Sequence, residues 1–276
     1  MIRKITGLLL LIFAMASSPM VRAQSAYYNY IDTAEMKIKK QNWLQAERYI
    51  LMALKAEPAN KNNSLLISNL ATVQRNQKKY IEALKNYDLA LAMTPKSVTL
   101  LKNRASLYLE IDSLSHAYMD YEKVTLLDRE DIESRYYHGL IALRKGQIDV
   151  AKADFGDLLR INPYSPYTKE AQATLQKTLG NYEEAIEYYS DLIKMQETPS
   201  YHTLLNRAEC YLEIEKLNEA ETDIRHAIAK APTEAYLYVL RARLNKLRRL
   251  PGDMERDIQL AMKYGISREM ALFFIK

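Results

Sequence analysis

Apolar residues recur every three or four positions along most of the chain, in segments separated by short polar breaks. This spacing places them on one face of a helix and predicts amphipathic helices. In every second segment, a small residue is followed four positions later by an aromatic or β-branched residue, and three positions after that by another apolar residue. The pattern predicts an all-α chain of paired helices.

The small residues recur with a fixed period. In the second helix of each pair the corresponding positions are 34 to 37 residues apart, at Ala46, Ala83, Ala117, Ala151, Ala185, Ala220 and Met254, so that six of the seven are alanine. Twelve residues before each of them is an alanine or glycine: Ala34, Ala71, Ala105, Gly139, Ala173, Ala208 and Ala242. The longest spacing contains the polar stretch "ANKNN", Ala59 to Asn63, which we interpret as a surface-loop insertion. A period of this length is typical of stacked helical hairpins.

This pattern resembles the tetratricopeptide repeat (TPR) family, which has small residues at repeat positions 8 and 20, aromatic residues at 11 and 24, and proline near 32. The resemblance places seven repeats over residues 27–267, starting near Tyr27, Ser64, Val98, Ile132, Pro166, Tyr201 and Ala235. The chain departs from the family in lacking tryptophan at position 4 and, in three repeats, proline at position 32. Position 20 of the last repeat is Met254.

The repeat positions have a physical meaning. Small residues at 8 and 20 let the two helices approach closely, and the large residue at 24 fills the space beside them. A single hairpin cannot bury its apolar face, so neighbouring hairpins must stack into an α-α superhelix. Gly146, Gly180 and Gly252 mark three of the expected turns within hairpins.

The last residues, 268–276, predict a short helix that caps the final repeat. Ser267 precedes them as a candidate N-cap, and "MALFFI" supplies an apolar surface. The alternative is that this apolar surface is a homodimer interface.

The first residues predict an export signal over 1–23. Arg3 and Lys4 precede an apolar run that is too short to span a bilayer, and "VRA" ending at Ala23 offers small residues for cleavage. We expect an exported, soluble protein, periplasmic or secreted, without a transmembrane span once the signal is removed. It should not be a lipoprotein, because Cys210 is the chain's only cysteine. The alternative is an uncleaved membrane anchor.

Charge and composition favour neither nucleic-acid binding nor catalysis. Without Arg3, Lys4 and Arg22, 36 basic residues remain against 34 acidic residues. The chain therefore lacks the excess of positive charge that binding to nucleic-acid phosphates requires. The cluster "RARLNKLRR", Arg241 to Arg249, is interpreted as a solvated face in preference to an anion site. No two of the four histidines are three or four residues apart, and no glycine-rich loop occurs. We therefore expect no metal, no cofactor and no enzymatic activity. Cys210 and Trp43 are interpreted as packing residues.

In the TPR family, ligands lie on the concave face formed by the first helix of each repeat, at positions 2, 5, 9, 12 and 13. Here those positions carry both signs of charge and several tyrosines. The carboxylate-binding clamp of the chaperone-binding branch is incomplete, since only its asparagine at position 6 is present. The candidate partner-binding residues are Asn69, Asn103, Asn206, Tyr136, Tyr167, His202 and Tyr236.

The resemblance implies a non-enzymatic scaffold or adaptor of the cell envelope, which would bind a peptide or partner protein in the concave groove. The alternative function is that of an accessory protein that binds a solute or glycan through the groove tyrosines.

Overall fold

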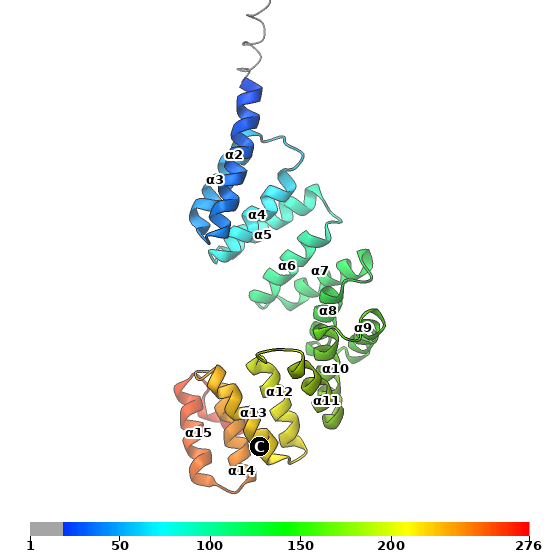
Figure 1. Ribbon diagram of the computed structural model, residues 1–276, viewed down its shortest axis with the longest axis vertical. Helices are drawn as coiled ribbons and strands as arrows, with labels where there is room; N and C mark the ends of the chain where they lie inside the picture. Colours follow the sequence, from blue (N-terminus) through cyan, green and yellow to red (C-terminus); the bar gives the residue numbers. More distant parts are fainter. Residues whose placement is uncertain (1–18, 276) are drawn as a thin grey trace, which may run out of the picture. The chain divides into compact units, whose positions relative to one another are not determined.

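The computed structural model describes residues 19–275 of the chain, and these are all-α, with fifteen helices and no strand. Seven pairs of helices follow one another along the chain, and one short helix comes after them (Figure 1). The chain divides into two compact units, unit 1 at Met1–Ser134 and unit 2 at Arg135–Lys276. The predicted fold class, all-α with seven helix pairs and a C-terminal helix, is confirmed for the described residues.

Unit 1 contains three hairpins, and the unit boundary falls within the helix that follows them. The hairpin helices are α2 (Pro19–Lys39), α3 (Trp43–Ala56), α4 (Asn63–Asn76), α5 (Tyr80–Met93), α6 (Val98–Glu110) and α7 (Leu114–Leu127). Within the unit, α3 packs on α4 and α5 packs on α6, so successive hairpins share their apolar faces. Trp43 is half-buried against the first cluster of core residues, as expected of a packing residue.

Unit 2 begins inside α8 (Ile132–Arg144) and contains the remaining helices. These are α9 (Ile148–Ile161), α10 (Pro166–Leu179), α11 (Tyr182–Lys194), α12 (Tyr201–Glu213), α13 (Leu217–Lys230), α14 (Ala235–Leu247), α15 (Pro251–Lys263) and α16 (Arg268–Phe274). In this unit, α11 packs on α12 and α13 packs on α14.

The residues assigned to close helix packing are buried. The six alanines at position 20 of the second helices have no exposed surface, and Met254, at the same position of the last repeat, is partly buried against α14. The large residues at position 24 are also almost fully buried, and include Tyr87, Phe155 and Tyr189. Burial of these side chains in every hairpin supplies the apolar contact that stabilises the stack.

Gly139 is the one glycine among the small residues of the first helices. A Cβ atom built on it would lie 2.3 Å from Cε1 of Phe155, far inside van der Waals contact. The Phe155 ring therefore occupies the volume that a methyl group fills in the other repeats, which explains glycine at this position.

Each hairpin turn contains one residue in the left-handed region of the backbone, always at repeat position 15. Only two of these residues are glycine, Gly146 and Gly180; the others are Gln41, Lys78, Asp112, Glu215 and Arg249. Gly252 was predicted to mark a turn, but it lies in the first helical turn of α15 after Pro251, and Arg249 takes the left-handed position there. The sequence signal failed because five side chains accept a conformation that glycine adopts without strain.

We expect Lys78→Gly to raise the free energy of unfolding by about 0.5–1 kcal/mol, because lysine at this φ of 61° has a steric strain that glycine lacks. Urea denaturation followed by circular dichroism measures the change. The matched control is Gly180→Ala, at a φ of 81° with no atom within 4 Å of the added Cβ, which should lose about 1 kcal/mol. A destabilised Lys78→Gly variant would contradict this account.

The C-terminal helix α16 begins as predicted, because the Ser267 hydroxyl accepts a hydrogen bond from the backbone N–H of Met270 at 3.2 Å. Ala271 and Ile275 are buried against α14 and α15. Lys246 of α14 donates to the carbonyl of Ile275 at 2.9 Å. The helix therefore covers the last hairpin through one face.

Of the predicted export signal, residues 1–18 lie outside the described residues, and residues 19–23 form the start of α2. Among the described residues, no helix combines the length and the apolar character needed to cross a bilayer.

Candidate functional site

Four hairpins contain a buried acid bonded to a basic residue or histidine of the same hairpin. The acids stand at repeat position 23 and are 2–6 % exposed, and the partners stand at position 7. The pairs are Arg104–Asp120, His138–Asp154, Arg207–Asp223 and Arg241–Asp257. Since these pairs link the two helices of one repeat, we assign them to the scaffold and not to a binding site.

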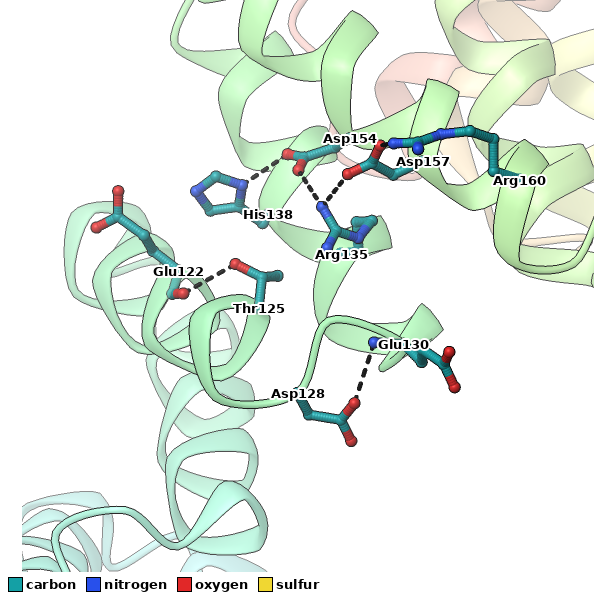
Figure 2. Close-up of polar contacts among 9 residues, drawn as sticks. All are labelled: Glu122, Thr125, Asp128, Glu130, Arg135, His138, Asp154, Asp157 and Arg160. Atoms are coloured by element: carbon teal, nitrogen blue, oxygen red, sulfur yellow. Dashed lines mark hydrogen bonds and ion pairs between the residues drawn. The ribbon is translucent and has the colours of Figure 1, made fainter.

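The pair in the fourth repeat differs from the others, because histidine replaces arginine at position 7. Nδ1 of His138 lies 2.6 Å from Asp154, and Arg135, one helical turn earlier, reaches both Asp154 and Asp157 (Figure 2). Asp157 also pairs with Arg160. Both acids of this cluster are bonded to basic side chains of the same cluster, which fits a structural role.

Charged residues on the inner face connect the first helices of neighbouring repeats. We define the inner face as positions 2, 5, 9, 12 and 13 of the first helices. In unit 1, Arg75 pairs with Glu110 at 2.6 Å, and Lys102 pairs with Glu133 at 2.7 Å. In unit 2, α12 supplies two acids to its neighbours: Glu209 pairs with Lys177 of α10 at 2.7 Å, and Glu213 pairs with Arg243 of α14 at 2.8 Å.

A pocket of about 350 Å³ opens on the inner face of unit 2. Its walls come from α10, α11, α12, α14 and α16, and its lining residues are Lys177, Tyr182, Glu209, Glu213, Tyr236, Arg243, Phe273 and Phe274. The Tyr236 hydroxyl donates to Glu209 at 2.8 Å, and the Tyr236 ring meets Phe274 edge to face, with ring centroids 5.4 Å apart. Four aromatic side chains and two ion pairs thus surround one opening.

Tyr236 and Arg243 stay protonated in the pocket near neutral pH. Burial, followed by the charge of Glu209, raises the pKa of Tyr236, so its hydroxyl remains a hydrogen-bond donor. The hydrogen bond from Arg243 to Glu213 raises the pKa of that guanidinium, so it remains charged. The pocket therefore presents a hydroxyl donor, a guanidinium cation and aromatic surface, which suits binding.

A second group of inner-face residues is centred on Glu170 of α10. Tyr136 of α8 donates a hydrogen bond to its carboxylate, and the ring centroids of Tyr136 and Tyr167 lie 5.0 Å apart. His202 of α12 is close enough to lower the pKa of Glu170, although burial outweighs this effect and raises that pKa overall. We call these four residues the Glu170 cluster.

Five of the seven predicted partner-binding residues lie at these two places. Tyr136, Tyr167 and His202 belong to the Glu170 cluster. Tyr236 lines the pocket, and Asn206 stands beside it, accepting a hydrogen bond from Lys177 at 2.6 Å. The other two, Asn69 on α4 and Asn103 on α6, are half-buried residues of unit 1.

Sequence reasoning missed Phe273 and Phe274 as pocket residues. Both were assigned to the cap, yet they are 65 % and 42 % exposed, and they line the pocket together with first-helix residues. The only signal was the run of apolar residues in "ALFFI", which exceeds what one face of a short helix can bury.

Neither the cysteine nor the basic cluster suggests chemistry. Cys210 is fully buried, and burial raises the pKa of its thiol to about 12, so it is no nucleophile near neutral pH. Within the cluster, Arg241, Arg243 and Arg248 each pair with an acid, which agrees with a neutralised surface and not an anion site. No group of three potential metal ligands occurs in the described part of the chain.

Comparison with known proteins gives the class of protein. The family model described as tetratricopeptide repeat matches residues 170–235. A solved tetratricopeptide repeat protein from Parabacteroides merdae is 30 % identical, and the structural match covers 91 % of this chain and 98 % of that one, with a TM-score of 0.75. The chain therefore belongs to the tetratricopeptide repeat family, whose members are generally non-enzymatic and mediate protein–protein interactions.

Curated relatives are more distant. DnaJ homolog subfamily C member 3 of Gallus gallus is 26 % identical over 180 residues, which are 58 % of this chain and 35 % of the relative. Mitochondrial import receptor subunit TOM34 of Rattus norvegicus is 24 % identical over 210 residues, which are 61 % of this chain and 67 % of the relative. The chain spans about a third of the length of the DnaJ-type relatives it matches.

Proposed function

We propose that this protein is a non-enzymatic scaffold or adaptor of the cell envelope that binds a peptide or partner protein on the inner face of unit 2. The observation that carries the proposal is the pocket lined by Tyr182, Tyr236, Phe273 and Phe274. Partly exposed aromatic rings beside paired polar groups are typical of protein-recognition sites, where tyrosine gives a large contact area at small entropic cost.

The proposed location in the cell envelope rests on the sequence of residues 1–23. Fractionation of cells that produce the full chain tests it: export predicts a shortened protein in the periplasm or medium, and full-length protein kept in the cytoplasm or membrane contradicts it.

The binding proposal is tested by peptide selection. A displayed library of random twelve-residue peptides is selected on the purified protein, and the affinities of enriched peptides are measured by calorimetry. We expect Tyr236→Ala to weaken binding at least about tenfold, because it removes the central aromatic contact and the hydrogen bond to Glu209. Tyr164→Ala, at a tyrosine that is 78 % exposed and outside the pocket, is the control and should leave binding unchanged.

Absence of enriched peptides, or equal loss in both variants, would contradict the binding proposal. Binding of saccharides without peptides would favour the alternative function as a glycan-binding accessory protein. The exposed Phe273 also keeps the homodimer proposal open, and sedimentation equilibrium of wild-type protein and Phe273→Ser tests it.

A further inference from the structure

Glu170 differs from the other carboxylates on the inner face of unit 2. Glu209 and Glu213 each hold a cation from a neighbouring repeat, at 2.7 and 2.8 Å. Glu170 is half-buried, and among the residues that the structure describes it forms no ion pair with lysine or arginine. Its hydrogen bond comes from a neutral group, the Tyr136 hydroxyl. A carboxylate removed from water in this way is costly unless a cation joins it.

The surroundings of Glu170 suit a flat cation. Tyr136 and Tyr167 stand together with ring centroids 5.0 Å apart, and Tyr137 lies within 6.4 Å of Tyr167. Aromatic rings attract cations through the negative charge of their faces, and a guanidinium can stack on tyrosine while hydrogen-bonding a carboxylate. The tyrosine rings and the Glu170 carboxylate, which has no lysine or arginine partner among the described residues, together complement arginine better than lysine or a neutral side chain.

We propose that the Glu170 cluster binds an arginine side chain of the segment that occupies the inner face. This inference rests on the proposed function in one respect, namely that the ligand is a polypeptide. The preference of the Glu170 cluster for a guanidinium can be measured independently. The Glu170 carboxylate accepts hydrogen bonds from the guanidinium, and the half-buried ring of Tyr167 provides the stacking surface. Tyr136, which is 5 % exposed, holds the carboxylate through its hydroxyl, and His202 is exposed.

Among residues 19–275, His202 of α12 is the cation whose charge acts on Glu170. An arginine ligand and the His202 side chain would compete for the same carboxylate. His202→Gln removes this competitor and should strengthen arginine binding.

The direct test uses a small probe on the full chain. Spectra of protein labelled with ¹³C at tyrosine and histidine side chains are recorded during titration with N-acetyl-arginine amide at pH 7.5. We expect saturable shifts of the Tyr136, Tyr167 and His202 signals. The citrulline derivative, which has the same shape without the charge, should bind at least about tenfold more weakly.

Two matched variants locate the effect. Glu170→Gln should weaken binding of the arginine probe at least about tenfold, whereas Glu221→Gln, at an acid of α13 that is already paired with Arg248 and lies outside the pocket, should leave it unchanged. Absence of saturable shifts, equal binding of the citrulline probe, or equal loss in both variants would overturn the inference. None of these results would touch the proposed function, which the peptide selection tests separately.

A second measurement separates a binding role from a structural role. Since burial raises the pKa of Glu170, the folded protein favours the neutral carboxyl, and its stability falls as pH rises through that pKa. The neutral amide of Glu170→Gln avoids this loss. In a His202→Gln background, the variant should therefore unfold at a higher temperature than its parent at pH 7, and the difference should shrink near pH 4. A variant that is less stable at pH 7 would show that Glu170 is structural and would overturn the inference.

Discussion

Replacing Asp223 with alanine is expected to lower the free energy of unfolding by about 3 kcal/mol. Asp223 is 3 % exposed and accepts two hydrogen bonds from the Arg207 guanidinium, at 2.7 and 2.8 Å. Arg207 is half-buried beside the ring of Tyr211, so truncation of the acid leaves a cation in a site without its counter-charge. Removing one partner of a buried ion pair destabilises a protein more than replacing both partners with apolar residues.

The loss should be local and specific to the buried pair. Urea denaturation gives its size, and hydrogen exchange should show opening first in α12 and α13, because each hairpin of a repeat protein contacts only its neighbours. Asp191→Ala is the control, since Asp191 is an exposed partner of Lys169 and its loss should cost about 0.5 kcal/mol or less. The double replacement Asp223→Ala with Arg207→Met should cost less than Asp223→Ala alone, and a result in the opposite order would contradict this account.

Gly139→Ala is expected to destabilise the protein by about 2 kcal/mol, although alanine is the better helix former. The added Cβ would lie 2.3 Å from Phe155, so the ring or the helix must move. Gly156→Ala in α9 is the matched control. No atom lies within 4 Å of its added Cβ, so the same substitution should stabilise by about 0.5–1 kcal/mol.

Thermal or urea unfolding of the two alanine variants distinguishes these effects by sign. The double variant Gly139→Ala with Phe155→Leu should be less destabilised than the sum of its single variants, because the smaller side chain leaves room for the methyl group. Two glycine variants that shift in the same direction would show that backbone propensity, and not the Phe155 contact, decides the outcome.

The fold could be predicted from the sequence because a fixed period repeats the same packing positions. Small residues such as Ala105 and Ala208, in the matching phrases "NRASLYLEI" and "NRAECYLEI", are fully buried as expected. The same phrases also contain Arg104 and Arg207, whose bonds to Asp120 and Asp223 were not predicted. Their partners are aspartates 16 residues further along the chain. Aspartate is also common on solvated helix faces, so the local sequence does not show that these two are buried in ion pairs.

The candidate site could be predicted only in part. The helical period placed Tyr136, Tyr167 and Tyr236 on the first helices, but it could not show that Tyr136 contacts Glu170, whereas Tyr236 contacts Glu209 and Phe274. Those contacts depend on the spacing of neighbouring repeats and on the position of α16. Asn103 and Asn206 illustrate the limit: they match in sequence, yet a hydrogen bond from Lys177 reaches Asn206 alone.

The ion pairs between neighbouring first helices have a consequence for how binding would respond to salt. A ligand cation that binds Glu209 must displace Lys177. The complex then has as many ion pairs as the free protein. A ligand arginine at Glu170 adds an ion pair that the free protein lacks. Affinity should therefore change little with ionic strength for partners held at the pocket, and fall with it for partners that reach Glu170. A salt titration would thus map where along the inner face a partner lies.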